Sequence, residues 1–527
     1  MSRFVINRRQ ALTGAAAVLG TALTAGVASA ETADPFLLGV ASGDPLPDRV
    51  VLWTRLVRDV YDAASMPSHP VPVQWQVAED ERFRRVVRSG TAFARPSLAH
   101  SVHVDACGLL PGRDYYYRFR AHGELSPVGR TRTAPAPHTD PARLRFAVAS
   151  CQDFQNGYWP AYTAMAAEDL DLVLHLGDYI YEYDPASRFP DRLHVAPETP
   201  GLDQLRTLSD YRNRHAQYKG DPALRAAHAA FPWVVTWDDH EVENNYANLV
   251  DELDSGDSHQ TPAAFAAQRA AAYQAYFEHM PIRAAYQPGS TDLRMYRGLD
   301  FGRLARMSVL DTRQHRTDQP GGLPSDFGPE FLGTGNTAGT LTGAEQERWL
   351  ADGLTTSSAR WNVVAQQVML SRTRLPNFTP VPPVIVNLDQ WDGYAPQRKR
   401  LLDLLVDNKV ANPVFLAGDI HSTWVSELKR DFDDPASPSV AVEFVGTSIS
   451  SDFPAAYDAP LKQTNPLFNP HVKYFDGLKR GYLRCEVDAD QWRTDVRVVS
   501  GIDAPSAPIS TAVSFAVESG TSKITVV

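Results

Sequence analysis

Side chains that can bind a metal ion or exchange a proton gather in four short polar segments of this sequence. Each segment directly follows an apolar run typical of a buried strand, and ligands of α/β folds gather beyond the carboxyl ends of such strands. Packing does not require carboxylates there, because uncompensated buried carboxylates are costly. The pattern therefore predicts a shared metal site. The segments are Ser150-Cys151-Gln152, Gly177-Asp178-Tyr179-Ile180-Tyr181, Trp237-Asp238-Asp239-His240-Glu241 with Asn244-Asn245 close behind, and Gly418-Asp419-Ile420-His421.

Taken singly, several of these residues also have an ordinary structural explanation. A Gly-Asp pair after a strand often forms a turn, which alone would explain Asp178. A lone cysteine such as Cys151 usually packs as a small buried hydrophobe. His240 and His421 are equally compatible with hydrogen-bonded structural imidazoles. The convergence of four segments favours metal binding over these interpretations.

The donor set is rich in oxygen and poor in imidazole. Zinc sites favour His and Cys together. A phenol has a pKa of about 10, so Tyr181 as a ligand near neutral pH implies a strong Lewis acid. Ferric iron fits a tyrosinate with Asp, Cys and one His, and the remaining carboxylates and amides suit a hard cation such as calcium. The residue types favour a mixed Fe³⁺ and Ca²⁺ centre over two zinc ions. The oxygen donors are Asp178, Tyr181, Asp238, Asp239, Asp419 and Asn244 or Asn245.

The elements that must position these donors fall into two predicted domains. Residues 34–137 carry short alternating apolar runs separated by turn clusters, a pattern typical of a β-sandwich. Within them, residues 109–115 resemble the tyrosine corner of fibronectin-III-type sandwiches, with Tyr115 as its tyrosine. A proline-rich polar linker follows, and we expect the second domain to span residues 143–527.

Apolar strands alternate with helical patterns in the second domain, which predicts an α/β layout with helices over a largely β centre. Two long loops rich in glycine and proline, residues 318–340 and 376–396, are expected to shape the site. Trp391 and Tyr394 lie in the second loop, where packing is a better explanation than a place at the mouth. The predicted helices are residues 158–168, 202–230, 262–279, 343–355 and 396–407.

Residues 1–30 are predicted to be an export signal rather than part of the fold. They contain arginines but no acidic residue, then a run of small apolar residues, and they end in Ala28-Ser29-Ala30, an A-x-A cleavage site. The pair Arg8-Arg9 indicates the twin-arginine (Tat) pathway; the alternative is a Sec signal with a chance arginine pair. We therefore expect a secreted, cell-wall or periplasmic protein. No later segment is long and apolar enough to span a membrane.

Composition narrows the classes of partner. The 527 residues are 43% hydrophobic and 21% charged, a profile typical of soluble globular proteins. Asp and Glu outnumber Lys and Arg by 62 to 51, which argues against a nucleic-acid-binding partner. An odd count of three cysteines in an exported protein suggests that one is a metal ligand, and whether Cys107 and Cys485 pair is left open. We expect a monomer.

The ordered set of motifs SCQ, GDYIYEYD, WDDHEVENNY, LDTRQHR, DQWDGY and AGDIHS resembles the PhoD-type alkaline phosphatase/phosphodiesterase family of calcineurin-like metallophosphoesterases. GDYIY is also similar to the GDxxY motif of purple acid phosphatases. The resemblance covers most of the chain and implies an α/β fold: a metallophosphoesterase-type β-sandwich flanked by helices, preceded by a small all-β fibronectin-III-like domain.

This sequence departs from the wider superfamily pattern in two places. The opening D-x-H is replaced by Ser150-Cys151-Gln152, and the closing G-H-x-H has become Gly418-Asp419-Ile420-His421. Both departures replace imidazole with other donors. They argue against two zinc or two manganese ions and agree with the iron–calcium centre that the family implies.

The resemblance also implies a role for each matched residue. Asp178 is expected to bridge the iron and a calcium ion. His240 stands where the superfamily places a catalytic His, and would protonate the leaving alkoxide or hydrogen-bond the phosphate. Arg313 is expected to contact phosphate oxygens, or else to form a structural ion pair with Asp311. Cys151, Tyr181 and His421 are the further iron ligands, and Asp239, Asp419, Asp238 and Asn245 are the calcium ligands.

The function implied is hydrolysis of phosphate monoesters, and also of diesters, by a hydroxide formed from metal-bound water. One alternative is a dedicated phosphodiesterase acting on phospholipid, nucleotide or teichoic-acid diesters. The other is a non-catalytic protein that binds cell-wall polymer and uses metal only for stability. The partners expected are a phosphate-ester substrate and the Tat export machinery.

Overall fold

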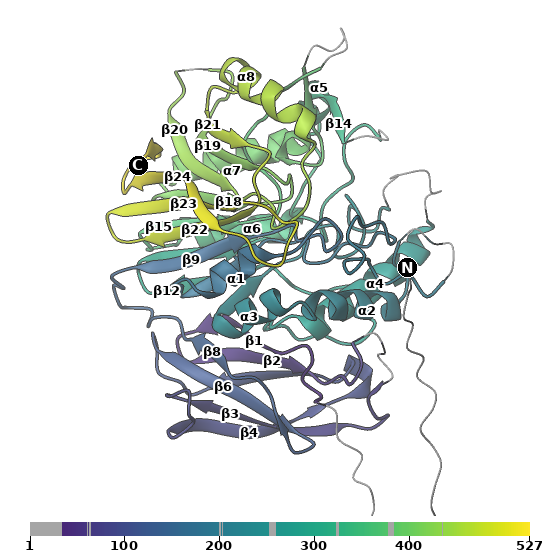
Figure 1. The fold of residues 1–527 in the computed structure, drawn as a ribbon. Coiled ribbons are helices and arrows are strands. Elements are labelled where there is room, and N and C mark those ends of the chain that lie inside the picture. The colour runs from purple at the N-terminus through teal and green to yellow at the C-terminus, as the bar shows by residue number, and fades with distance from the viewer. Residues whose placement is uncertain are drawn as a thin grey trace, which may run out of the picture. The chain divides into compact units, whose positions relative to one another are not determined.

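The computed structural model describes residues 34–527, apart from 61, 63–64, 200–201, 203, 252–259, 323–325, 378–383 and 435. Residues 34–527 form one compact unit, shown as a ribbon in Figure 1. The predicted export signal, residues 1–30, lies outside the described residues.

A ten-stranded sheet holds three of the four donor segments. Its strands β9, β10, β11 and β1 are mutually parallel in that order, and β22 pairs antiparallel with β9. In spatial order the strands are β25 (Thr525–Val526), β24 (Ile509–Glu518), β23 (Gln491–Val499), β22 (Gly481–Val487), β9 (Leu144–Ala149), β10 (Leu172–His175), β11 (Pro232–Val235), β1 (Val40–Leu46), β2 (Arg49–Arg55) and β5 (Ser101–Cys107).

A seven-stranded sheet holds the fourth donor segment. Its central strands β13, β15, β18 and β20 are parallel, and β12 and β19 pair antiparallel at the two ends of that run. In spatial order the strands are β12 (Arg297–Phe301), β13 (Ala305–Val309), β15 (Trp361–Ala365), β18 (Pro413–Ala417), β20 (Ser439–Val445), β19 (Thr423–Lys429) and β21 (Val472–Asp476).

The two sheets pack face to face, because side chains alternate along each strand. Phe146 and Val148 of β9 point into a buried cluster with Met307, Val363 and Leu416 of the second sheet. The alternate residues of β9 face the opposite way, into a cluster with the helices. A sandwich with helices on its outer faces is the fold class that the motifs implied.

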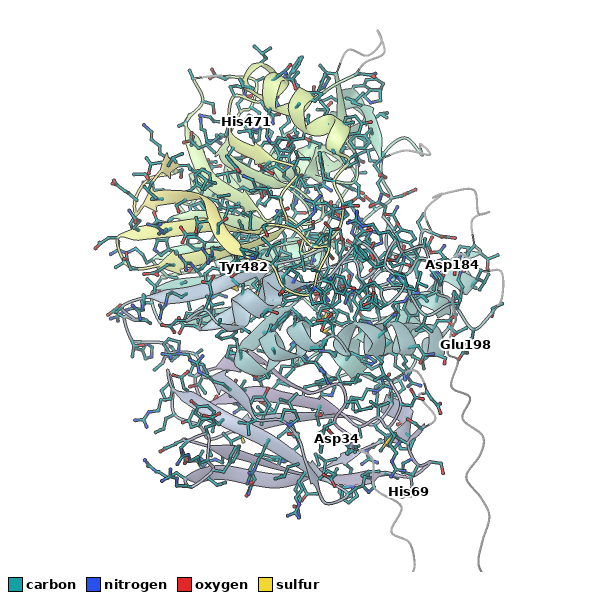
Figure 2. The ribbon with its side chains drawn as sticks, in the orientation of Figure 1. Asp34, His69, Asp184, Glu198, His471 and Tyr482 are labelled. Atoms are coloured by element: carbon teal, nitrogen blue, oxygen red, sulfur yellow. The ribbon has the colours of Figure 1, made fainter. Side chains whose placement is uncertain are left out.

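Helices cover both outer faces of the sandwich (Figure 1). The ten-stranded sheet packs on α1 (Pro160–Ala166), α2 (Leu208–Lys219), α3 (Pro222–Ala230) and α4 (Pro262–His279). The seven-stranded sheet packs on α6 (Gly343–Thr355) and α7 (Ala395–Asp407). The long connection from β10 to α2 carries exposed residues such as Asp184 and Glu198 (Figure 2).

The single helix predicted over residues 202–230 is wrong, because the structure has two helices there. Gly220 ends α2, and the Asp221 carboxylate then caps α3 by accepting the backbone N–H groups of Ala223 (2.9 Å) and Leu224 (3.2 Å). Pro222 follows as the first residue of α3, where its missing N–H costs nothing. Polar capping outweighs the helical periodicity that continues across the break.

The N-terminal strands form a second, smaller sandwich. Strands β2 and β5 share a core with β3 and β6, and the backbone N–H of Leu110 donates to the hydroxyl of Tyr115 (2.9 Å), the contact expected of a tyrosine corner. One side of this sandwich is the far end of the ten-stranded sheet, because β1 pairs with β11. The other side comprises β4 (Val86–Ala94), β3 (Val71–Ala78), β6 (Asp114–Ala121), β7 (Glu124–Leu125) and β8 (Gly129–Arg132), with the 3-10 helix η2 (Pro96–Leu98) between β4 and β5.

Several of the elements that the sequence analysis did not predict lie in or near the two long loops. They are a small sheet of β14 (Phe327–Pro329), β17 (Val384–Asn387) and β16 (Leu375–Pro376), the helices α5 (Glu330–Thr334) and α8 (Asp458–Phe468), and the 3-10 helices η3 (Trp391–Tyr394) and η4 (Ala455–Tyr457). Trp391 and Tyr394 are buried in the core beneath α6 and α7, as packing residues. Among the described residues, no helix has the length and apolarity of a membrane span.

Candidate metal centre

The carboxyl ends of parallel strands from both sheets meet at one place. The backbone N–H of Cys151, after β9, donates to the carbonyl of Gly177, after β10 (3.1 Å). The N–H of Ile449, after β20, donates to the carbonyl of Ser150 (3.0 Å), which ties the second sheet to the first. These bonds hold the donor segments together before any side chain is considered.

Gly177 lets two donor segments approach each other closely. A Cβ at this position would lie 2.4 Å from the Cβ of Asp238 and 2.5 Å from its backbone nitrogen. Its φ of +110° is also one that L side chains rarely adopt. Glycine is therefore required here by both contact and conformation.

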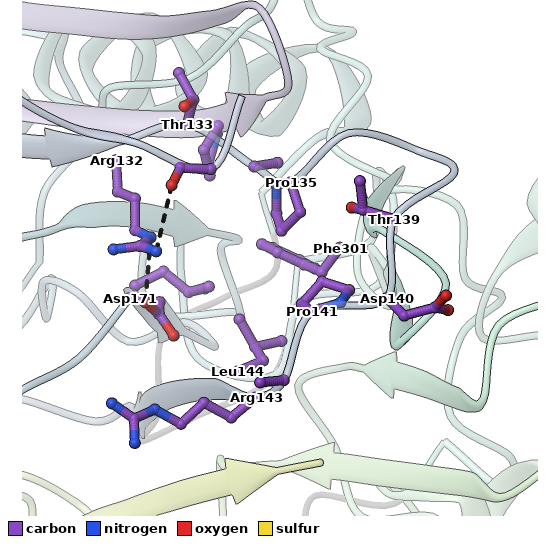
Figure 3. Close-up of a pocket in the computed structure, with 15 residues that line it drawn as sticks. Arg132, Thr133, Pro135, Thr139, Asp140, Pro141, Arg143, Leu144, Asp171 and Phe301 are labelled. Atoms are coloured by element: carbon purple, nitrogen blue, oxygen red, sulfur yellow. Dashed lines mark hydrogen bonds and ion pairs between the residues drawn. The ribbon is translucent and has the colours of Figure 1, made fainter. Parts of the chain in front are cut away.

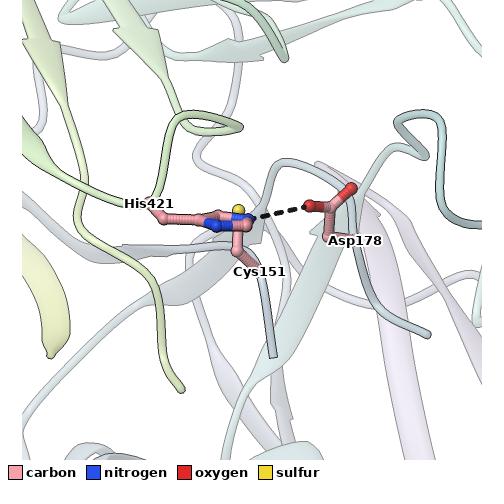
Figure 4. Close-up of side chains that lie close together, drawn as sticks. All are labelled: Cys151, Asp178 and His421. Carbon is pink, nitrogen blue, oxygen red and sulfur yellow. Dashed lines mark ion pairs between the residues drawn. The ribbon is translucent and has the colours of Figure 1, made fainter. Parts of the chain in front are cut away.

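Four predicted iron ligands lie together. The ligand atoms of Cys151, Asp178 and His421 all lie within 4.8 Å of one another, and Figure 4 shows these three side chains converging. The Tyr181 hydroxyl is 2.8 Å from Oδ2 of Asp178 and 3.1 Å from Nε2 of His421. The structure thus brings thiol, carboxylate, imidazole and phenol to one point.

Two further groups of donors adjoin the first. Asp178, Asp239 and His240 form one, and Asp238, Asp239 and Asp419 form the other, each with its ligand atoms within 4.8 Å. Asp178 belongs to two groups and Asp239 to two, so the three groups form a continuous cluster. A shared Asp178 is the arrangement that a bridging carboxylate requires.

Buried oxygens without partners indicate that this cluster fits cations. Among the described residues, Oδ1 of Asp178, Oδ2 of Asp238 and Oδ1 of Asp239 are buried and accept no hydrogen bond. Buried acceptors normally have partners. A metal ion would supply a partner to all three of these oxygens, which the hydrogen bonds of the described residues leave without one.

The protonation of the cluster supports the same fit. Burial raises the pKa of Asp419 to about 7 and that of Asp238 well above its ordinary value. Burial and then the nearby Asp178 raise the pKa of the Cys151 thiol and of the Tyr181 phenol. A bound cation would oppose these shifts, because metal ligands bind in deprotonated form.

Backbone conformation is unusual at the donors. Cys151, Asp178, Asn245, Asp419 and His421 all have φ between +52° and +67°, in the left-handed region. This conformation costs non-glycine residues free energy and collects at functional sites. Five of the predicted donors share this conformation.

His240 lies at the edge of the cluster with its ring held from behind. Its Nδ1 is 2.8 Å from Oε2 of Glu182, and its ring lies 4.2 Å from that of Tyr181. Burial disfavours the charged imidazole, but the nearby carboxylates of Glu182 and Asp239 outweigh it and raise the pKa of His240 well above its usual value. A protonated His240 is suited to donate a proton or a hydrogen bond.

Arg313 does not form the predicted ion pair with Asp311, whose carboxylate instead accepts the backbone N–H of Arg313 (3.1 Å). The guanidinium is fully buried and holds Asp389 through two nitrogens, at 2.8 and 2.9 Å. It also contacts Asp238 (2.5 Å) and Asp419 (3.1 Å). Arg313 is therefore a counter-ion that positions carboxylates, while its direct contact with phosphate stays a prediction.

The structure adds residues to which the motifs assigned no role. The carboxylate of Glu241 accepts the backbone N–H groups of Asp178 (3.1 Å), Tyr179 (2.6 Å) and Asp238 (2.8 Å), and so clamps two donor loops. Asp389, and Gln390 which donates to Asp419 (2.5 Å), come from the loop at 376–396. These residues lie inside the motifs WDDHEVENNY and DQWDGY, and their place in those motifs is the feature of the sequence that could have identified them.

Asn245 lies beside the cluster rather than inside its groups. Its backbone N–H donates to Oδ2 of Asp239 (2.8 Å), and its amide nitrogen donates to Asp326 (2.7 Å) from the loop at 318–340. The backbone N–H of Asn244 donates to Glu182 (2.8 Å). Both long loops therefore reach the donors, as expected.

The other cysteines take no part in the cluster. Cys107 is exposed on β5, Cys485 is buried on β22, and both are free. A separate cavity of about 330 Å³ lies beside the predicted linker, with Pro135 and Pro141 in its wall and an Arg132–Asp171 ion pair of 3.3 Å at its edge (Figure 3). It contains none of the candidate donors.

Comparison with known proteins agrees with the motifs. The family model described as PhoD-like phosphatase matches residues 146–496, and that of the PhoD-like phosphatase N-terminal domain matches residues 20–135. The chain is 50% identical over 490 residues to alkaline phosphatase D of Bacillus subtilis (strain 168), covering 91% of this chain and 80% of that protein. A solved structure of PhoD matches with a TM-score of 0.85 and 48% identity, covering 94% of this chain and 92% of the other. These matches confirm the predicted family resemblance and fold class.

Proposed function

The chain belongs to the PhoD-like phosphatase family and is a phosphoric ester hydrolase, and from this premise we propose an exported alkaline phosphatase that uses iron and calcium. It would hydrolyse phosphate monoesters and also accept diesters. The observation that carries the proposal is the continuous donor cluster with its three buried carboxylate oxygens that accept no hydrogen bond.

The donor types divide the cluster between two kinds of cation. Cys151, Tyr181 and His421, with Asp178, supply the thiolate, phenolate and imidazole that suit Fe³⁺. Asp178, Asp238, Asp239 and Asp419, beside Asn245, supply only oxygens and suit Ca²⁺. Cations held there would lower the pKa of the attacking water and take up charge on the phosphate.

The chain's own residues supply the remaining steps. His240, fixed through its Nδ1 by Glu182, would protonate the leaving alkoxide or hold a phosphate oxygen. Arg313 holds the carboxylates in position, and Glu241 holds the loops after β10 and β11 together. Preorganisation of this kind holds substrate and nucleophile in reacting geometry, which accounts for much of phosphoryl-transfer catalysis.

Export is proposed from the first thirty residues. Arg8-Arg9, the apolar run and Ala28-Ser29-Ala30 support Tat-dependent transport to the cell surface, cell wall or periplasm. The absence of a disulfide among the three cysteines is compatible with folding before export, which that pathway allows. Arg8→Lys with Arg9→Lys should leave active enzyme inside the cells, and unchanged export of that double variant would contradict the Tat proposal.

The central experiment measures hydrolysis of p-nitrophenyl phosphate and of its bis-ester at alkaline pH, with purified protein whose iron and calcium content has been measured. We expect activity to be lost with a calcium chelator and restored by Ca²⁺, and the ratio of the two rates ranks monoesterase against diesterase. Tyr181→Phe should remove the visible absorption that a phenolate gives on ferric iron. Iron- and calcium-loaded protein that hydrolyses neither ester would contradict the proposal.

A further inference from the structure

An apolar cavity of about 360 Å³ adjoins the metal-donor cluster. Its walls come from the small β14–β17–β16 sheet, the loop after β18, and the segment that leads into α8. Beneath it lies a separate buried cluster around Met369, Trp424 and Phe475. The cavity thus has a packed floor of its own and is not part of the main core.

The cavity and the donor cluster share a wall. Ile420 lines the cavity and stands in the chain between Asp419 and His421, two of the donors. Gln390 also lines it, and binds both sides: its Oε1 accepts the backbone N–H of Met369 (2.6 Å), and its Nε2 donates to Asp419 (2.5 Å). The donor cluster and the cavity are therefore neighbours that meet at Ile420 and Gln390.

The chemistry of the two sides is opposite. The cluster has buried carboxylate oxygens that accept no hydrogen bond, whereas none of the described residues that line the cavity has a buried polar side-chain atom without a hydrogen bond. The indole N–H of Trp424 donates to Ser422 (2.9 Å), whose hydroxyl donates to the carbonyl of Ile420 (2.9 Å). Asp392, the one charged lining residue, is neutralised by Arg398 (2.5 Å). The cavity offers apolar surface and no available charge.

The rim indicates the size and type of the occupant. Phe327 and Tyr457 stand at the wall with 44% and 51% of their surface exposed. Exposed aromatic side chains beside an apolar hollow favour a flat or compact apolar group. A second phosphate, or a sugar with many hydroxyls, would lose its hydration there and gain no charged partner.

We propose that this cavity binds a compact apolar substituent, such as an aryl ring, on the ester group of the substrate. The enzyme would then select phosphate esters whose ester group is apolar over small or polyhydroxy esters. The inference rests on the proposed function, since it assigns the phosphate to the donor cluster. Burial of a phenyl ring should favour such a substrate by about 10- to 100-fold in kcat/KM.

The test compares 2-phenylethyl phosphate with ethyl phosphate, because their alcohols are similarly poor leaving groups and differ in the ring. Wild-type enzyme should prefer the phenylethyl ester by that factor. Ile385→Asn, a neutral change in the half-buried wall, and Tyr457→Ser at the rim should bring the ratio toward one. Leu467→Ser is the matched control, since Leu467 is 78% exposed on α8 and does not line the cavity.

A binding measurement separates this inference from the proposed function. Calorimetry with 2-phenylethylphosphonate and ethylphosphonate needs no turnover, because their carbon–phosphorus bonds are not hydrolysed as esters. Tighter binding of the aryl compound, lost in Ile385→Asn, would support the cavity even in protein that hydrolyses nothing. Equal binding of the two phosphonates, or a preference that persists in both variants, would overturn the inference while leaving the phosphatase proposal intact.

Discussion

Arg313 gathers carboxylates that would otherwise repel one another. Its buried guanidinium holds Asp389 with two bonds and reaches Asp238 and Asp419 from the same position. Asp389 follows β17 of the small sheet, Asp419 follows β18 of the seven-stranded sheet, and Asp238 follows β11 of the ten-stranded sheet. A planar, permanently charged fork suits this task, and a lysine ammonium does not reproduce it.

The first prediction therefore concerns Arg313→Lys. We expect the variant to bind Ca²⁺ at least tenfold more weakly. Its free energy of unfolding should be about 3 kcal/mol lower, because the substitution leaves buried carboxylates without partners. Calcium titration and urea unfolding measure the two effects. A direct phosphate contact predicts the opposite pattern: unchanged calcium affinity and weaker inhibition by inorganic phosphate.

His240 supplies the second prediction. If it protonates the leaving alkoxide, His240→Gln should lower kcat for an alkyl phosphate by about 10²- to 10⁴-fold. The loss for p-nitrophenyl phosphate should be much smaller, because p-nitrophenolate leaves without a proton. Steady-state rates on the two esters decide the matter, and an equal loss on both would assign His240 to phosphate binding instead.

Individual site residues were predictable from the sequence where a motif directly follows a predicted strand. Cys151, Asp178, Tyr181 and His421 were each predicted from such positions, and the structure brings them together. The partners of Arg313 were not predictable, because they depend on how loops from distant strands fold over one another. The sequence analysis offered a local ion pair with Asp311 as the alternative to a phosphate contact, yet Asp311 accepts a backbone N–H.

At the scale of elements, the site depends on two loops passing within contact distance at Gly177. Gly177→Ala would place a methyl group against the backbone of Asp238 and force an L residue to a φ near +110°. We expect a loss of about 1–3 kcal/mol of stability and a drop in calcium affinity. Gly501→Ala is the control, since nothing lies within 4 Å of its added Cβ. Matching effects of the two substitutions would refute the argument.

Glu443, on β20, binds the loop that follows β15, and its ionisation makes the free energy of unfolding depend on pH. Its carboxylate accepts the backbone N–H groups of Leu370 (2.6 Å) and Ser371 (2.8 Å). Burial raises the pKa of Glu443 from 4.5 to about 7. The folded state thus binds this proton more tightly than the unfolded chain, so the associated stability is present below about pH 4.5 and is lost as pH rises through 7.

The corresponding prediction compares wild type with Glu443→Gln. Between pH 4.5 and 7 the wild-type free energy of unfolding should fall, relative to the variant, by up to about 3 kcal/mol. Above pH 7 the difference between the two proteins should stay constant. Urea unfolding at intervals of one pH unit provides the measurement, and a difference that does not change with pH would show that Glu443 is ionised throughout.

Strands and helices were predictable where periodicity ran without interruption. The predicted helices 262–279 and 343–355 agree with α4 and α6. The break between α2 and α3 was missed because a helical pattern continues across it. The strands β14, β17 and β16 were missed because each has at most four residues, and α8 was missed because Pro460 and Pro466 interrupt its helical pattern.

At the scale of the whole molecule, the two predicted domains share one sheet. The linker marks where the chain passes between them, yet β1 pairs in parallel with β11 across that division, at Ser42 with Pro232 and Gly43 with Trp233. Ion pairs add to the contact: Asp44 binds Arg297 (2.7 Å). Composition could reveal the linker, but a pairing between strands so far apart in sequence leaves no local signal.

The last prediction follows from that shared sheet. Residues 143–527 expressed alone would expose β11 as an open edge, and would also uncover the α4 surface on which the indole N–H of Trp53 donates to the carbonyl of Glu278 (3.0 Å). An exposed, apolar strand edge promotes aggregation. We therefore expect this fragment to be insoluble, and residues 34–527 to unfold in urea as one transition by both fluorescence and circular dichroism. A soluble, active 143–527 fragment would show instead that the catalytic part is an independent folding unit and that the shared strand pair contributes little to its stability.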